Sequence, residues 1–183
     1  MIREWGEVEE SGEPESPAAP IDGLPSPHRR QERLSAVVSG QGFTGEYRHQ
    51  IDDKGRIAIP SKMRALLAGP IFVSRWLDAC LAILPGSEWD AITEKVAGLP
   101  MTDPAARALE RRLFGGAVEA ELDRQGRILL PENLRQFAAL DGEVVVVGSR
   151  SHAEIWAPAR WDAQMAVLDD DAAFGAAISG LRI

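Results

Sequence analysis

The chain has 183 residues, of which 45% are hydrophobic, and a formal net charge of −8, so it can form one compact domain or two small ones with a buried core. No run approaches the roughly 18 to 20 apolar residues of a membrane span, and residues 1–40 lack the apolar region of a signal peptide. The single cysteine, Cys80, excludes an internal disulfide, and we expect it to be a small buried hydrophobe in a reducing compartment.

The acidic net charge argues at first sight against a polyanionic partner, but much of it lies near the two ends of the chain. Residues 41–162 hold fifteen Lys and Arg against seventeen Asp and Glu, so the body is nearly neutral. Because the local field rather than the net charge governs binding, such a body can bind DNA if its cations share one face.

Residues 1–42 are predicted to be a disordered, acidic and proline-rich tail. Five prolines with many Glu and Ser residues leave little that could form a core. The segment is a tail, a misassigned start or a sequence foreign to the protein. Folded sequence is expected to begin near Gly42-Phe43.

The first repeat, 43–100, is predicted to contain, in chain order, a strand, a turn, a strand, a helix, two strands and a helix. These elements span 44–51, 52–55, 56–59, 60–67, 71–75, 80–84 and 85–96. In the turn, Asp52 can accept bonds from nearby amides and Gly55 can take positive φ. Pro60 suits the first turn of a helix, and Ser87 is a possible cap of the last one.

The linking segment, 101–116, is predicted to be a helix from Asp103 to Phe114 that Gly115-Gly116 ends, with Leu109 and Leu113 on one face. The second repeat, 117–168, has the order of the first. Its strands span 117–122, 127–130, 143–148 and 153–157, its turn 123–126, and its helices 131–137 and the segment from 158. Val144–Val147 is expected to be buried from both sides. Trp89 and Trp161 occupy matching helix positions and are expected to be core anchors.

A ten-residue segment that occurs twice shows that the two repeats arose by duplication. Ile51–Pro60, IDDKGRIAIP, aligns without a gap with Leu122–Pro131, LDRQGRILLP, 71 residues further on. Four short strands with one apolar face rarely form a stable sheet alone, so each repeat needs the other. The sequence therefore predicts an α+β fold, mostly β, in which strands of the two repeats interleave as a pseudo-two-fold barrel with flanking helices.

At these residues the chain resembles the MraZ family over roughly 43–168. The family's Gly-Glu-Tyr followed by Asp-x-Lys-Gly-Arg-x-x-x-Pro is present from Gly45 to Pro60, its middle signature at Glu110–Ala117, and its second motif at Glu121–Pro131. The resemblance implies a swapped-hairpin β-barrel of the SpoVT/AbrB type within one polypeptide. The tail before residue 42 is a departure, because family members usually lack it.

The resemblance also implies a transcriptional regulator that binds double-stranded DNA in the cytoplasm and nucleoid. It is typically a repressor at the promoter of the division and cell-wall gene cluster that contains its own gene, and a ring-shaped homo-oligomer. The family's DNA-facing element is the Asp-x-x-x-Arg motif, whose arginine contacts bases. Carried over, this marks Asp52 and Arg56 in one copy and Asp123 and Arg127 in the other.

Arginine suits base recognition because its planar fork can donate two bonds to O6 and N7 of guanine, worth ~1–3 kcal/mol of discrimination. A carboxylate is repelled by phosphate, so each Asp is expected to shape its turn, with Gly55 or Gly126, or to orient its arginine. Other polar side chains near the motifs are candidate base or phosphate contacts, or else solvated charges. They are Lys54, Gln125, Arg48, Lys62, Arg64, Arg124 and Arg135.

Two other functional classes, an enzyme and a protein-interaction module, would require different sequence features. An enzyme is disfavoured because His28, His49 and His152 are scattered and no nucleophile, phosphate-loop or metal-ligand spacing is present. We expect no cofactor, metal or small-molecule substrate, and Asp52-Asp53 is expected to be a solvated turn. A protein-interaction module, such as an antitoxin of related fold, usually carries one copy and a partner-binding tail. In the C-terminal tail, 169–183, and the residue before it, four apolar side chains are spaced like a helix face that could dock a partner: Leu168, Phe174, Ile178 and Leu181.

Overall fold

The computed structural model describes residues 42–168, 175 and 178–179. The predicted N-terminal tail therefore lies outside the described residues, except for Gly42. Of the predicted apolar face in the C-terminal tail, Phe174 and Leu181 also lie outside, while Ile178 is described and exposed. None of the described helices has both the length and the apolar character to cross a membrane.

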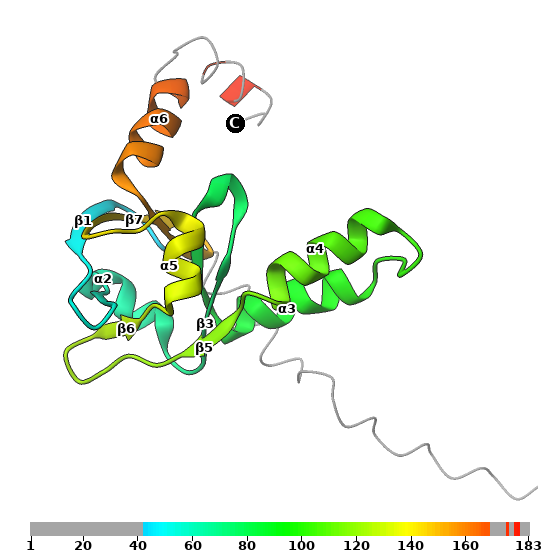
Figure 1. The fold of residues 1–183 in the computed structure, drawn as a ribbon, viewed down its shortest axis with the longest axis horizontal. Coiled ribbons are helices and arrows are strands. Elements are labelled where there is room, and N and C mark those ends of the chain that lie inside the picture. Colours follow the sequence, from blue (N-terminus) through cyan, green and yellow to red (C-terminus); the bar gives the residue numbers. More distant parts are fainter. Residues whose placement is uncertain (1–41, 169–174, 176–177, 180–183) are drawn as a thin grey trace, which may run out of the picture.

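The elements follow the predicted order in both repeats and form an α+β fold (Figure 1). The first repeat contains β1 Glu46–Gln50, β2 Arg56–Ala58, α2 Ser61–Arg64, β3 Ile71–Arg75, β4 Leu81–Pro85 and α3 Gly86–Ala97. After the linking helix α4, Pro104–Phe114, the second repeat contains β5 Val118–Ala120, β6 Arg127–Leu129, α5 Glu132–Ala138, β7 Glu143–Ser149, β8 His152–Trp156 and α6 Pro158–Leu168.

Strands of the two repeats pair with one another. A six-stranded sheet has the order β1-β7-β8-β4-β3-β5, and β2 and β6 form a separate two-stranded sheet. The antiparallel pairs β1·β7, β4·β8, β3·β5 and β2·β6 each take one strand from each repeat. The structure therefore has interleaved strands. Its sheet order leaves β1 and β5 at the ends, so closure into a swapped-hairpin barrel stays a prediction.

The core lies on both faces of the larger sheet, and β7 shows why. Val144 and Val146 point into the main cluster with the inward side chains of β2 and β6, whereas Val145 packs with Cys80 and Trp156 on the other face. The double burial expected of this valine run follows from the alternation of side chains along a strand. Cys80 is buried as predicted, and burial is the main reason that the pKa of its thiol is raised.

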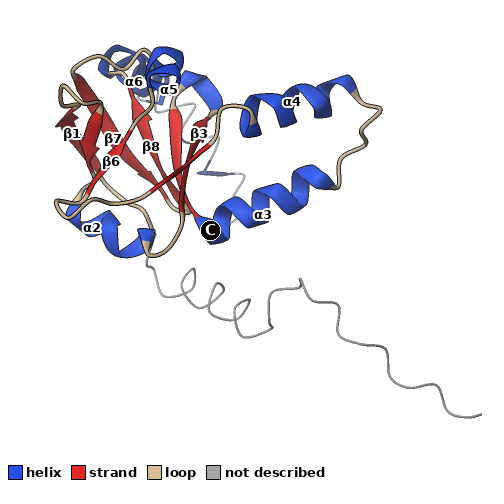
Figure 2. Ribbon diagram, turned by 60° about the horizontal axis from the view of Figure 1, so that its bottom comes forward, coloured by secondary structure: helices blue, strands red, loops and turns tan. Residues whose placement is uncertain are grey.

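The two-stranded sheet is one layer of this core. Its inward side chains are Ile57, Ile59, Ile128 and Leu130, and each is almost completely buried. The helices α2 and α5 follow these strands and add Met63 and Leu134 to the same cluster. Figures 1 and 2 show α3 and α4 side by side, extending away from the strands. In both views β6 lies away from the α3–α4 pair.

Several helix details differ from the sequence predictions. Ser87 is wrong as a cap, because α3 begins at Gly86, whose N–H donates to the Pro70 carbonyl at 2.8 Å. That backbone bond satisfies one of the amides for which a side-chain cap would be needed. The predicted helix 60–67 is α-helical only to Arg64 and continues as a 3-10 turn, Ala65–Leu67.

The apolar side chains singled out on the helices are buried to different extents. Leu113 packs inward, but Leu109 on the same face of α4 is 44% exposed. Trp89 and Trp161 are half-buried at the margin of the core. Trp89 stacks on Phe72 with ring centroids 4.9 Å apart, and Trp161 lies 5.6 Å from Trp156. Both tryptophans therefore attach a helix to the sheet.

Candidate nucleic-acid interface

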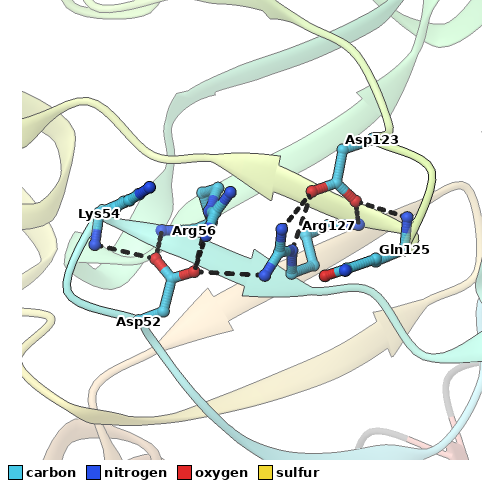
Figure 3. Close-up of polar contacts among 6 residues, drawn as sticks. All are labelled: Asp52, Lys54, Arg56, Asp123, Gln125 and Arg127. Carbon is cyan, nitrogen blue, oxygen red and sulfur yellow. Dashed lines mark hydrogen bonds and ion pairs between the residues drawn. The ribbon is translucent and has the colours of Figure 1, made fainter.

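The first Asp-x-x-x-Arg turn is built around one carboxylate (Figure 3). Asp52 Oδ1 accepts the backbone N–H groups of Lys54 and Arg56 at 3.0 and 2.9 Å. Its Oδ2 accepts Nε of Arg56 at 2.8 Å and lies 2.7 Å from Nη2. One oxygen therefore orders the turn and the other holds the guanidinium. Gly55 closes the turn at φ +77, a region that glycine takes without steric cost.

The second turn repeats this geometry. Asp123 Oδ1 accepts the backbone N–H groups of Gln125 and Arg127 at 2.8 and 3.0 Å. Its Oδ2 accepts Nε of Arg127 at 2.8 Å and lies 2.7 Å from Nη2. Gly126 has φ +74. The duplication visible in the sequence is therefore a duplication of side-chain geometry.

Both carboxylates are held ionised by these contacts. The side-chain and then the backbone hydrogen bonds from Arg56 lower the pKa of Asp52 from 3.8 to about 2. The backbone and then the side-chain hydrogen bonds from Arg127 lower the pKa of Asp123 by the same amount, to about 2. At neutral pH both pairs are therefore charged, and the two guanidinium groups are fixed in direction before any ligand arrives.

The two turns are joined across the pseudo-two-fold. The N–H of Ile59 donates to the Gly126 carbonyl at 2.9 Å, and the N–H of Leu130 donates to the Gly55 carbonyl at 2.8 Å. Each turn is thus bonded to the strand that follows the other turn. The position of each turn therefore depends partly on a backbone bond to the other repeat.

Two further arginines, Arg64 and Arg135, brace the same junction. Nε of Arg64 donates to the Ile59 carbonyl at 2.8 Å, and Nε of Arg135 donates to the Leu130 carbonyl at 3.1 Å. The guanidinium of Arg64 lies against Gly126, and that of Arg135 lies near Gly55. Both arginines were candidates for phosphate contacts or solvated charges, and in the structure their Nε groups donate to the backbone. Arg64 also contributes, after burial, to the lowered pKa of His49.

The outward face of β2 and β6 carries both motif arginines. Arg56 is paired with Leu129 and Ala58 with Arg127 in the antiparallel register. The side chains of Arg56 and Arg127 are 30% and 24% exposed. Arg127 is the more restrained, because its Nη1 also lies 3.5 Å from Oδ2 of Asp52. The two arginines therefore share one small surface.

The other predicted contacts fall into two groups. Lys54, Gln125, Arg124 and Lys62 are exposed on the turns or on α2, close to the motif in sequence. Arg48 lies elsewhere: it points to the face of β1 opposite Tyr47, and it is 3.6 Å from Glu143 and 3.4 Å from Asp162 on α6. The structure does not bring Arg48 together with Arg56 and Arg127.

Leu129 belongs to this surface but was not among the predicted site residues. It is 56% exposed, whereas its neighbours Ile128 and Leu130 are each 1% exposed. The signal was present in the sequence, since strand alternation turns the middle residue of Ile128-Leu129-Leu130 outward when the other two point inward.

Of the three histidines considered for catalysis, His28 lies outside the described residues, and His152 belongs to a network on β8. His152 contacts Ser151 Oγ and Glu154 Oε1, each at 3.2 Å, and Glu154 also accepts Nε1 of Trp156 at 2.9 Å. Burial acts to raise the pKa of Glu154, but these two hydrogen bonds outweigh it and lower the pKa. This network ties β8 together. Within the described residues, no group of three or more His, Cys, Asp or Glu side chains could hold a metal ion.

Comparison with known proteins gives a consistent result. A family model described as "MraZ protein, putative antitoxin-like" matches the chain twice, over residues 43–112 and 113–177. The "Transcriptional regulator MraZ" of Roseiflexus sp. (strain RS-1) is 44% identical over 141 residues, which cover 76% of this chain and 99% of the relative. The proteins of that name from Thermomicrobium roseum and Moorella thermoacetica are 47% and 51% identical over 126 and 120 residues, covering 69% and 66% of this chain and 89% and 84% of the relatives.

Proposed function

Because the chain belongs to the MraZ family, we propose that it is a transcriptional regulator that binds specific DNA sequences through the outward face of β2 and β6. The observation that carries the proposal is the pair of carboxylate-held arginines, Arg56 and Arg127, on one partly exposed surface (Figure 3). A two-stranded ribbon fits the major groove of B-DNA, where each base pair presents its own pattern of donors and acceptors.

The chemistry of the pair supports base recognition. A guanidinium has five N–H donors, and each Asp takes the edge formed by Nε and one hydrogen of Nη2. In Arg56 the donors on Nη1 and the outer hydrogen of Nη2 remain, whereas in Arg127 one Nη1 donor also faces Oδ2 of Asp52 at 3.5 Å. The donors that remain can match O6 and N7 of guanine. Because the Asp already fixes the fork, little side-chain entropy is lost on docking.

Around this centre, the exposed side chains supply weaker contacts. Lys54 and Gln125 stand at equivalent turn positions, and Arg124 and Lys62 extend the polar rim. They are the remaining candidates for phosphate or base contacts, whereas Arg48 is the weakest because two carboxylates already neutralise it.

The same proposal also covers the localisation, the regulated genes and the oligomeric state of the protein. We place the protein in the cytoplasm at the nucleoid, as a repressor of the division and cell-wall gene cluster, with both repeats closed into a swapped-hairpin barrel. A ring of identical subunits would present the same arginines repeatedly to tandem promoter repeats, and such linked contacts can raise avidity by ~10²–10⁴. In this role the protein uses no cofactor and turns over no substrate.

Arginine substitution tests the assignment. Arg56→Ala and Arg127→Ala each remove a contact worth ~5–150-fold per subunit, so sequence-specific binding in a mobility-shift assay should be lost. Light scattering should show an unchanged assembly. The matched control is Arg111→Ala, which removes the same charge from the exposed side of α4. Wild-type affinity in both motif variants would refute the proposal.

Salt dependence separates the two kinds of contact. Binding should weaken steeply with salt because phosphate contacts release counterions. Lys62→Ala and Arg124→Ala should each reduce the slope of log K against log salt by about 1 if these side chains touch phosphate, with little change in sequence preference. An unchanged slope would remove that residue from the interface.

The alternative is a protein-interaction module related to antitoxins. It predicts that the full-length chain retains a protein partner in a pull-down and that deletion of residues 169–183 abolishes the retention, while randomised DNA yields no preferred sequence. Selection of a defined motif from randomised DNA would decide against it.

A further inference from the structure

We infer that Leu129 is a base-reading residue, whose side chain contacts the 5-methyl group of a thymine next to the base bound by Arg56. The inference rests on the proposed function, since it names a second chemical element of the same recognition surface. It assigns to the surface an apolar specificity contact that the Asp-Arg pairs do not provide.

The first step is the placement of Leu129. A single exposed leucine is common on protein surfaces and carries no argument alone. Here, however, Leu129 is the cross-strand partner of Arg56 and stands two residues from Arg127 on the same face of β6. An apolar side chain, 56% exposed, thus shares one face of the ribbon with two arginines whose guanidinium groups are held by Asp52 and Asp123.

The second step compares the spacing of the two side chains with the spacing of bases in DNA. Side chains directly opposite each other on an antiparallel pair have Cβ atoms about 4.5–5.5 Å apart. Successive bases along one DNA strand are about 3.4 Å apart along the helix axis. If the fork of Arg56 binds one base in the major groove, its cross-strand neighbour therefore faces the adjacent base step.

The third step is the chemistry of the groove. The thymine 5-methyl is the apolar group that the major groove displays, and apolar side chains are its usual partners. Guanidinium and carboxylate groups cannot make this contact favourably. A leucine in this position adds a preference for thymine over cytosine, which lacks the methyl group and instead presents an amino donor.

The repeats differ at this point. The position equivalent to Leu129 in the first repeat is Ala58, which faces Arg127 and is half-buried. The smaller side chain offers less apolar surface there. The ribbon therefore pairs one arginine with a large apolar neighbour and the other with a small one, which gives the reading surface a direction.

The test removes single methyl groups from the DNA. Full-length protein first selects duplexes from a randomised library, and each thymine of the selected sequence is then replaced in turn by deoxyuridine. One thymine per repeat should show about a fourfold loss of wild-type affinity on replacement, the effect of burying one methyl group. Leu129→Ala should bind the thymine and uracil forms of that site equally, whereas Leu129→Met should keep the discrimination.

The possible outcomes separate failure of the proposed function from failure of the inference about Leu129. If wild-type protein selects no sequence, the proposed function fails and the inference falls with it. If a sequence is selected but every thymine can be replaced without loss, Leu129 does not read a methyl group and only this inference is overturned. A smaller assembly of Leu129→Ala in light scattering, with thymine discrimination kept, would place Leu129 at a contact between copies and would likewise overturn it.

Discussion

At the scale of single residues, each motif carboxylate does two things at once. The sequence left open whether Asp52 and Asp123 shape their turns or orient their arginines. The structure divides the tasks between the two oxygens, since Oδ1 binds backbone amides and Oδ2 binds the guanidinium. A residue pattern could indicate that Asp and Arg belong together, but this division depends on the conformation of the turn.

The lowered carboxyl pKa values give a direct test of these pairs. Because the folded pKa of each Asp is lowered from 3.8 to about 2, its ion pair contributes stability that is fully present above 3.8 and is lost as pH falls through about 2. Carboxyl carbon shifts followed by NMR should show Asp52 and Asp123 titrating near 2. In Arg56→Ala the pKa of Asp52 should rise toward 3.8.

The other pair serves as the internal control. In Arg56→Ala the pKa of Asp123 should remain near 2, because its partners are Arg127 and the backbone of its own turn. An Asp52 that titrates at its ordinary value in the wild-type protein would show that the guanidinium contact does not persist in solution. The orientation argument for Arg56 would then fail.

The bracing contacts of Arg64 and Arg135 across the junction were not predictable from local sequence, because the glycines that they pack against lie in the other repeat. Arg64 and Arg135 follow the motifs at equal spacing and have the appearance of free cations. Only the β2–β6 pairing brings Arg64 over Gly126 and Arg135 toward Gly55. Arg64, which resembles a surface charge in the sequence, therefore supports the turn that positions Arg127.

Substitution of Gly126 tests this support. A Cβ at Gly126 would lie 2.7 Å from Nη1 of Arg64, and the residue has φ +74, so Gly126→Ala should destabilise the fold by ~1–3 kcal/mol in urea unfolding. Part of this cost comes from displacing Arg64. In the Arg64→Ala background the cost of Gly126→Ala should be smaller by at least ~0.5 kcal/mol. Strict additivity would contradict the contact.

At the scale of elements, hydrophobic periodicity located the strands well. Runs such as Val144–Val147 are governed by alternation, which is local, and the structure places successive valines in different clusters. Helix ends were predicted less well. The start of α3 depends on the Pro70 carbonyl, which is distant in sequence and takes over the role expected of Ser87. The exposure of Leu109 likewise depends on where α4 lies relative to the sheet.

Trp89 is predicted to hold the α3–α4 pair to the sheet. Its indole stacks on Phe72 of β3 and meets Phe114 of α4 edge-on at 5.2 Å. Trp89→Ala should therefore lower the free energy of unfolding by ~2–4 kcal/mol, somewhat less than for a fully buried tryptophan, and should speed amide hydrogen exchange in α3 and α4. Met101→Ala, at a side chain that is 76% exposed between the two helices, is the matched control and should change stability by less than ~0.5 kcal/mol. Equal effects of the two substitutions would show that the aromatic contacts do not anchor the pair.

At the scale of the whole molecule, duplication predicted that the repeats depend on each other, but not which strands pair. The observed order interleaves strands of the two repeats, with β7-β8 and β4-β3 as neighbours from the same repeat, and even the turns are bonded across the boundary. The duplication is also imperfect where it matters for recognition. Lys54 faces solvent where the second repeat has Gln125, and Ala58 stands where it has Leu129. If the chain binds DNA as proposed, this asymmetry gives it a direction on the duplex, which suits tandem repeats better than a palindrome.

Splitting the chain tests the dependence of the repeats. Residues 42–100 contain β1 to β4, but in the sheet β1 has no hydrogen-bonded neighbour from its own repeat, and the strand partner of β2 is β6, apart from one isolated bridge between Ile57 and Ile51. Each half alone would leave those edges and one side of the core open, so fragments 42–100 and 101–168 should each lack a cooperative thermal transition by circular dichroism. Mixed, they should recover one transition and dispersed amide NMR signals.

The break between the fragments lies in the turn between α3 and α4, where the exposed Met101 makes the chain accessible. Cleavage of the intact protein at this turn should therefore leave a folded two-fragment complex, which controls for the loss of the covalent link. A cooperative transition in fragment 42–100 alone would mean that the first repeat is an independent domain. The two Asp-Arg turns would then not need each other, and the shared surface of Arg56 and Arg127 would lose its structural basis, because each turn takes its strand bonds from the other repeat.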